Sequence, residues 1–150
     1  MKLKNLLVTA AAAAMCALPL PSWAQAAAVE AGRTDCGVLY IEPDSVSAVK
    51  KDGQYYLIFT AEEKYTDQEF LTSLRQEEEM QQAAAAVYLY MFNSFGSEYC
   101  LGAHYIIDAE GKVCLDLGSN LSMQPVGEDK TLKNAYTLAL KVWERKNSRL

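Results

Sequence analysis

The chain has 150 residues, of which 51% are hydrophobic and 22% are charged, and its formal net charge at pH 7 is −5. This length supports one domain with a modest core. An acidic chain whose basic residues cluster only near its C-terminus is a poor partner for nucleic acid or anionic lipid, so we expect neither as a ligand.

The first 26 residues have the order of a secretory signal peptide. Lys2 and Lys4 precede an apolar stretch over 6–20, and the small residues of 22–24 and 24–26 fit the positions that a signal peptidase reads. The apolar stretch is shorter than the roughly 20 residues of a membrane span. We therefore expect export, cleavage and no membrane span afterwards, with the periplasm, the cell surface and the medium all open as destinations.

Residues 27–150 are expected to form a single domain, which opens with a flexible lead-in over 27–35. A short apolar strand over 37–41 follows. Lys51-Asp52-Gly53 then separates two strand-like segments, 45–49 and 54–62. An Asp-Gly pair between such segments predicts a tight hairpin, because both turn positions need positive φ.

A helix is expected where the alternation ends, at Tyr65. Thr66 and Glu69 have the spacing of a capping box, and Tyr65 and Phe70 occupy the positions of a hydrophobic staple. This pattern predicts a helix over about 67–84. The three glutamates at 77–79 would point in different directions on it, which favours a solvated face over a cation site.

Three more strands and a second helix complete the expected fold. The strands cover 86–94, 98–108 and 112–117, with Gly111 in the last turn. After a loop, apolar residues recur at helical spacing over about 129–146. Together these segments predict an α+β protein with an antiparallel sheet of five to six strands and two helices.

The single histidine, His104, follows Cys100 by four residues within one predicted strand. Four strand residues span about 13 Å, whereas a thiol and its general base must lie about 3 Å apart. We therefore predict no catalytic residues here. If Asp108 pairs with Lys112, then Asp116 lies opposite His104, and we interpret His104 and Asp116 as a structural cross-strand pair.

Three cysteines follow the predicted leader: Cys36, Cys100 and Cys114. One disulfide and one spare thiol are the expectation for an oxidising compartment. The expected register separates Cys100 from Cys114 by about 20 Å, so any bond should include Cys36. Both Cys36–Cys100 and Cys36–Cys114 stay open, and we slightly favour Cys36–Cys100. No two cysteines have the spacing of zinc ligands, and we expect no metal and no cofactor.

Other catalytic signatures are missing from the sequence, including a glycine-rich phosphate loop and a nucleophile elbow. Four acidic residues could supply a carboxylate pair, but no pattern brings any two of them together: Asp35, Asp44, Glu62 and Glu63. Tyr88, Tyr90 and Phe92 share one strand face, which we interpret either as core or as an interaction surface.

Three segments resemble the surface-adhesin protein E-like family of small exported bacterial proteins. They are LYIEPDSV at 39–46, HYIIDAEGKV at 104–113 and QPVGEDKTLKNAYTLAL at 124–140. The resemblance implies an antiparallel sheet with a C-terminal helix and an exported location, and it adds support for a binding role. The family's disulfide does not carry over, because its cysteine positions fall near Ser94 and after Leu132, where this chain has none.

These observations favour an exported, non-enzymatic binding domain whose partner is a protein, an envelope component or a second copy of the chain. One alternative is a thiol-active protein or small enzyme, which requires a free, low-pKa thiol at Cys100 or Cys114. Another is a carrier of a small ligand in a pocket between sheet and helices, although no polar cluster in the sequence marks such a pocket.

Overall fold

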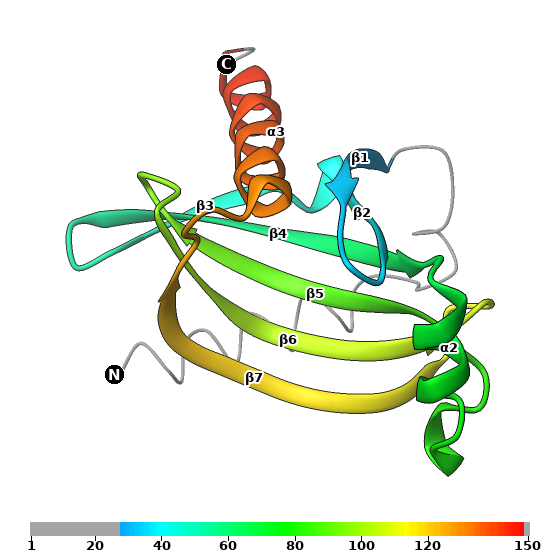
Figure 1. The fold of residues 1–150 in the computed structure, drawn as a ribbon. Coiled ribbons are helices and arrows are strands. Elements are labelled where there is room, and N and C mark those ends of the chain that lie inside the picture. The colour runs from blue at the N-terminus through cyan, green and yellow to red at the C-terminus, as the bar shows by residue number, and fades with distance from the viewer. Residues whose placement is uncertain (1–27, 149–150) are drawn as a thin grey trace.

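The computed structural model describes residues 28–148, so the predicted signal peptide lies outside the described residues. Its centre is a seven-stranded sheet in the order β1-β2-β4-β5-β6-β7, with β3 also paired to β4 (Figure 1). Every strand pair is antiparallel. The predicted α+β class with two helices is confirmed, and the sheet has more strands than expected.

The first half of the sheet is built around β4 (Gln54–Tyr65). β2 (Gly37–Ile41) pairs with the end of β4 and β3 (Ser47–Lys51) with its start. The predicted tight turn joins β3 to β4, with φ of 50° at Asp52 and 78° at Gly53. The hairpin prediction is therefore confirmed.

The predicted lead-in contains a strand. β1 (Val29–Arg33) pairs with β2, and Ala31 is buried. The C-terminal helix packs against this strand, and Thr131 donates a hydrogen bond to the carbonyl oxygen of Arg33. Partners distant in the sequence thus order a segment whose small, polar residues gave no local signal.

The mid-chain helix is shorter than predicted. α2 (Gln68–Leu74) begins after Asp67, whose carboxylate accepts a hydrogen bond of 2.7 Å from the amide of Phe70. The expected contact between the rings of Tyr65 and Phe70 is present, with centroids 4.9 Å apart. A 3₁₀ turn, η3 (Glu78–Met80), then leads into the next strand.

The last residues of the predicted helix, 83–84, belong instead to β5 (Ala83–Asn93). Ala83, Ala85 and Ala86 are all buried in the sheet. Small side chains at these positions let the strand pack closely, and pairing with β4 and β6 outweighs the high helix propensity of alanine.

β6 (Glu98–Asp108) has its predicted bounds, whereas β7 (Val113–Pro125) runs far beyond the predicted end at 117. The turn between them is as expected, because the Asp108 amide donates to the Lys112 carbonyl (2.9 Å) and Gly111 has φ of 84°. Both strands are strongly bowed (Figure 1).

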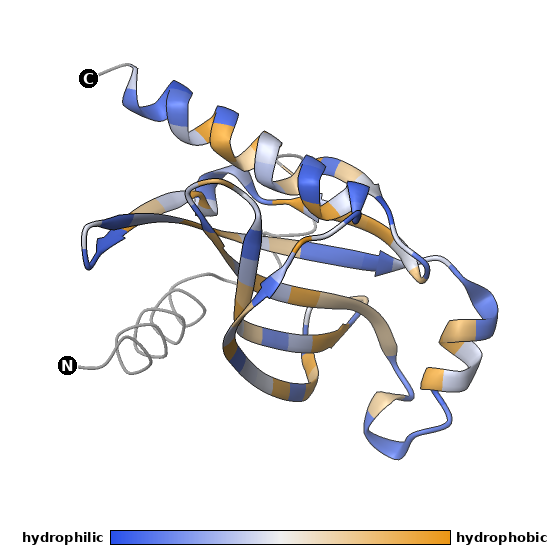
Figure 2. Ribbon diagram, turned by 60° about the vertical axis from the view of Figure 1, so that its left-hand side comes forward, coloured by the Kyte–Doolittle hydropathy of each residue, from blue (hydrophilic) through white to orange (hydrophobic). Residues whose placement is uncertain are grey.

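The C-terminal helix, α3 (Lys130–Asn147), packs against β1, β2 and β4 on one face of the sheet. Its hydrophobic and hydrophilic residues alternate along the ribbon (Figure 2). The buried positions Leu132, Ala135 and Ala139 join a core cluster with strand residues such as Phe59 and Phe92. The predicted apolar stripe is thus the contact between this helix and the sheet.

Candidate functional site

A cavity of about 260 Å³ lies between the start of α3, the β1–β2 turn and the middle strands of the sheet. We call it the Glu63 cavity. Its lining combines carboxylates, hydroxyls, tyrosine rings and leucines: Thr34, Leu39, Glu63, Tyr88, Tyr90, Tyr99, Leu101, Asp129, Thr131 and Leu132.

Glu63 is the charged group inside this cavity, and its side chain is only 8% exposed. Its two carboxylate oxygens accept hydrogen bonds from the hydroxyl of Tyr88, at 2.6 Å, and from the hydroxyl of Thr34. No lysine or arginine lines the cavity. The buried charge is therefore held by neutral donors and not by an ion pair.

The alternation of β4 places this carboxylate beneath α3. Leu57, Phe59 and Ala61 point into the core under the helix, and Glu63 is the next residue on the same face. Sequence reasoning missed its role. The one local signal for the role of Glu63 was that an acidic residue continues an apolar strand face. The sequence around Thr34 and Asp129 gave no such signal.

The tyrosines form two walls of the cavity. The rings of Tyr88 and Tyr90 are stacked with centroids 5.3 Å apart, and the Tyr99 ring meets Tyr90 edge-on at 5.8 Å and 64°. Burial raises the pKa of Tyr88 and Tyr90 far above the ordinary range, and the nearby Glu63 carboxylate raises both further. These phenols therefore stay protonated and serve as hydrogen-bond donors and ring surfaces.

The start of α3 forms the rim of the cavity. The Asp129 carboxylate accepts a hydrogen bond of 2.9 Å from the amide of Leu132 and so caps the helix. Lys133 forms an ion pair of 3.4 Å with Glu128 instead of with Asp129. The Asp129 carboxylate at the rim is therefore not paired with Lys133.

The predicted pair of His104 and Asp116 is wrong. Register shifts between β6 and β7 place Gly118 opposite His104 and Asp116 opposite Tyr105. The Asp116 carboxylate instead accepts a hydrogen bond of 2.8 Å from the amide of Gly118. The His104 ring lies 4.6 Å from that of Tyr88, and burial lowers the pKa of His104, although the Glu63 carboxylate opposes this shift.

The favoured disulfide is also corrected. Cys36, Cys100 and Cys114 are all free thiols within the described residues. Cys36 lies just past the end of β4, because its carbonyl oxygen accepts a hydrogen bond from the amide of Thr66. Cys100 lies level with Ile58 of β4, because it is opposite Met91, which pairs with Ile58. Positions 58 and 66 are eight residues, or ~26 Å, apart along the strand direction. A direct bond between Cys36 and Cys100 is incompatible with this register.

The thiols are not activated. Burial raises the pKa of Cys100 to about 11, and it also raises the pKa values of Cys36 and Cys114. Cys100 lies opposite Met91 and His104 lies opposite Tyr88, three residues away on β5, so the two side chains point to opposite faces of the sheet. The Cys100 thiol and the His104 imidazole therefore do not face a common site.

The face of Tyr88, Tyr90 and Phe92 is not an open interaction surface. Tyr90 is 6% exposed and Phe92 is fully buried, with the Phe92 ring 5.4 Å from that of Tyr136 on α3. Tyr88 is half-buried and lines the cavity. Of the two interpretations from the sequence, core is correct for Tyr90 and Phe92.

A second hollow, of about 610 Å³, lies where the β3–β4 and β5–β6 turns meet. Two exposed aromatic residues line it: Phe95 at 87% exposure and Tyr55 at 53%. The loop that carries Phe95 is tightly held. The Tyr136 hydroxyl donates to the carbonyl oxygen of Ser94 at 2.7 Å, and the Asn93 side chain accepts from the Ser97 amide at 3.0 Å.

Within residues 28–148, no three His, Cys, Asp or Glu side chains are grouped so that they could hold a metal ion. In the same part of the chain, no helix has both the length and the apolar character needed to cross a membrane. Comparison of the chain with family models, with curated proteins and with solved structures gave no match. The resemblance to the surface-adhesin protein E-like family therefore stays a prediction.

Proposed function

We propose that the protein is an exported, non-enzymatic binding domain that takes a small ligand in the Glu63 cavity. The observation that carries this proposal is a buried carboxylate, 8% exposed, inside a cavity walled by tyrosine rings. Pockets for small ligands combine apolar and aromatic walls with a few convergent polar groups. This cavity supplies the polar cluster that the sequence alone did not reveal.

The chemistry of the site favours binding over catalysis. Acid–base or nucleophilic catalysis needs a group whose pKa is tuned toward neutrality and a partner within hydrogen-bond reach. Burial moves the pKa values of the tyrosines and thiols upward instead. A raised pKa makes each of these groups a poorer nucleophile near neutral pH, and this weakens the alternative of a thiol-active protein or enzyme.

A matched pair of tryptophan substitutions tests the proposal. Leu101→Trp places a large ring in the cavity wall, whereas Leu117→Trp adds the same ring at a position on β7 that is 51% exposed. We expect a mixed set of charged and neutral fragments to shift the NMR signals of cavity residues in the wild type and in Leu117→Trp, but not in Leu101→Trp. Equal shifts in both folded variants would place binding elsewhere.

The exposed Phe95 supports a second candidate, recognition of a protein partner through the sheet end. An aromatic ring on a rigid loop binds with little loss of conformational freedom. We expect Phe95→Ser to lose association with proteins of the cell envelope in a pulldown, and Leu117→Ser, at another exposed apolar position, to retain it. Retention by both variants would rule out this surface.

A further inference from the structure

The formal charges that face the Glu63 cavity are negative. Glu63 lies inside it and Asp129 at its rim, and its lining contains no lysine, arginine or histidine. These two carboxylates are the charged side chains that act on Tyr88, Tyr90 and Tyr99, and both raise tyrosine pKa values. The field in the cavity therefore favours a positively charged group.

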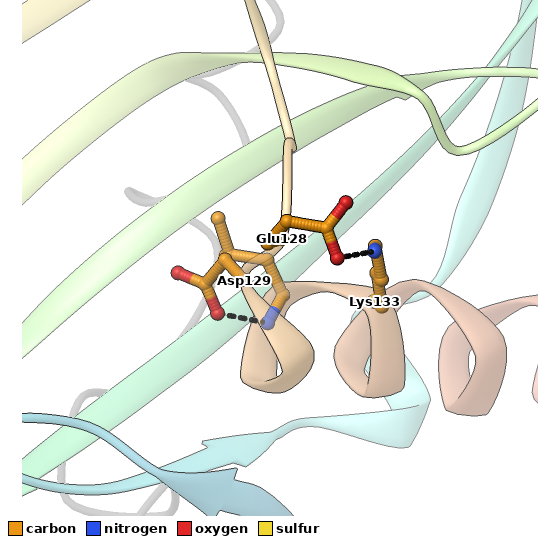
Figure 3. Close-up of polar contacts among 4 residues, drawn as sticks. Glu128, Asp129 and Lys133 are labelled. Atoms are coloured by element: carbon orange, nitrogen blue, oxygen red, sulfur yellow. Dashed lines mark hydrogen bonds and ion pairs between the residues drawn. The ribbon is translucent and has the colours of Figure 1, made fainter.

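The start of α3 is the main competing source of positive potential. A helix N-terminus carries about half a positive charge and by itself favours an anion. Here the Asp129 carboxylate already accepts from the Leu132 amide, and Lys133 is engaged by Glu128 (Figure 3). Lys130 and Arg33 are exposed and line no part of the cavity. Two full negative charges thus outweigh the helix terminus.

The rings add a second attraction for a cation. The faces of aromatic rings carry negative potential, and a cation placed over them is attracted to it. Tyr90 and Tyr99 meet at 64°, so two ring surfaces form a corner, and Tyr88 stacks beside Tyr90. Burial lowers the pKa of His104, beside Tyr88, and this disfavours its charged form.

The size of the cavity suits a small molecule. Its volume of about 260 Å³ lies just below the range usual for ligand pockets, about 300–1,000 Å³. Leu39, Leu101 and Leu132 supply apolar walls for methyl or methylene groups. An alkylated ammonium group meets all three conditions of charge, ring contact and volume.

We propose that the Glu63 cavity, taken as the ligand site of the function proposed above, binds the ammonium head of a small organic amine. Glu63 is its counter-ion, and Tyr88, Tyr90 and Tyr99 form its aromatic wall. Asp129 adds attraction from the rim. The Glu63 carboxylate already accepts hydrogen bonds from Tyr88 and Thr34. An alkylated ammonium group suits it because such a ligand needs a negative charge nearby more than it needs further hydrogen bonds.

Three probes of one shape test this assignment on the purified full chain. They are choline, the uncharged dimethylbutanol in which carbon replaces its nitrogen, and the dimethylbutyrate anion. We expect choline to shift the NMR signals of the cavity tyrosines with at least tenfold higher affinity than the alcohol, about 1.4 kcal/mol, and the anion to give no saturable shift.

Two charge-removing variants locate the cation. Glu63→Gln keeps the shape of the side chain, and we expect it to reduce choline affinity at least tenfold. Asp129→Asn keeps a good helix cap and should reduce affinity about twofold to threefold. Glu79→Gln, at an exposed position outside the cavity, should leave affinity unchanged. Near-ultraviolet circular dichroism checks that each variant is folded, and the comparison of probes on the wild type does not depend on any variant.

Equal affinity for choline and the alcohol would overturn the cation assignment, and so would undiminished choline binding by folded Glu63→Gln. If neutral or anionic fragments bind at the cavity tyrosines while choline does not, the cation assignment fails and the ligand-binding function stands. If no fragment of any charge binds there, both proposals fall.

Discussion

Thr34 and Gly37, in and just after the β1–β2 turn, hold this turn against the cavity. The Thr34 hydroxyl donates to Glu63 and accepts a hydrogen bond of 2.9 Å from the Gly37 amide. Gly37 has no side chain, and this lets β2 lie close to β4. A Cβ atom at this position would lie 1.9 Å from the carbonyl oxygen of Lys64. Gly37 thus sets the contact between β2 and β4, and Thr34 ties that contact to the buried Glu63 carboxylate.

We expect Gly37→Ala to lower the free energy of unfolding by about 2–3 kcal/mol, because the added methyl group meets backbone that cannot rotate away. Gly53→Asn is the control, since a Cβ at Gly53 meets nothing within 4 Å and asparagine tolerates positive φ. It should change stability by less than about 1 kcal/mol. Urea unfolding measures both values, and a similar loss in the two variants would contradict the close approach.

Elements whose cause is local could be predicted from the sequence. The Asp52-Gly53 turn needs two residues that tolerate positive φ, and the helix over 130–147 has an apolar stripe of period 3.6. Both signals lie within a few residues of one another. The same holds for the turn at Gly111, where the backbone conformation selects the residue.

Elements fixed by distant partners were predicted poorly. Residues 118–125 contain turn-forming types, yet they extend β7 along β6. β7 is an edge strand, and two of its own side chains bind its backbone amides: Asp116 accepts a hydrogen bond from the Gly118 amide, and Asn120 accepts one from the Ser122 amide. Polar residues that suggested a loop thus occupy a sheet edge, where they discourage pairing with another chain.

The candidate site was the least predictable feature. The hydroxyls of Thr34 and Tyr88 bind the Glu63 carboxylate, and Asp129 lies at the rim. No spacing rule relates these positions, because the sheet order and the packing of α3 bring them together. The prediction of His104 opposite Asp116 failed for a related reason, since bulges shift the register without a local signal.

At the scale of the whole molecule, one face of the sheet combines the main core with the cavity. α3 covers part of this face, and the cavity lies at the start of that helix. Several groups that would be negative when ionised are buried or half-buried in the folded chain, among them the Cys100 thiol and the phenols of Tyr65, Tyr88 and Tyr90. Their burial links the stability of the fold to alkaline pH.

We expect the free energy of unfolding to fall as pH rises above about 9. The pKa of Cys100 is raised to about 11 in the folded protein, from 9.0 for a free thiol. Between these values the unfolded chain releases its proton while the folded chain keeps it, so rising pH favours unfolding. The contribution of Cys100 is fully present below pH 9, and up to about 2–3 kcal/mol is lost by pH 11. The buried tyrosines, whose pKa values are raised in the same direction, extend the loss to higher pH.

Urea unfolding at pH 8, 9, 10 and 11 measures this loss, and Cys100→Ala isolates the thiol. The substitution lowers stability at every pH because it leaves a small gap in the core, so the slope is the quantity to compare. We expect a shallower slope between pH 9 and 11 in Cys100→Ala than in the wild type. Cys36→Ala, at a more exposed thiol, should change the slope less. A slope in Cys100→Ala equal to that of the wild type would show that the buried thiol does not govern the alkaline transition.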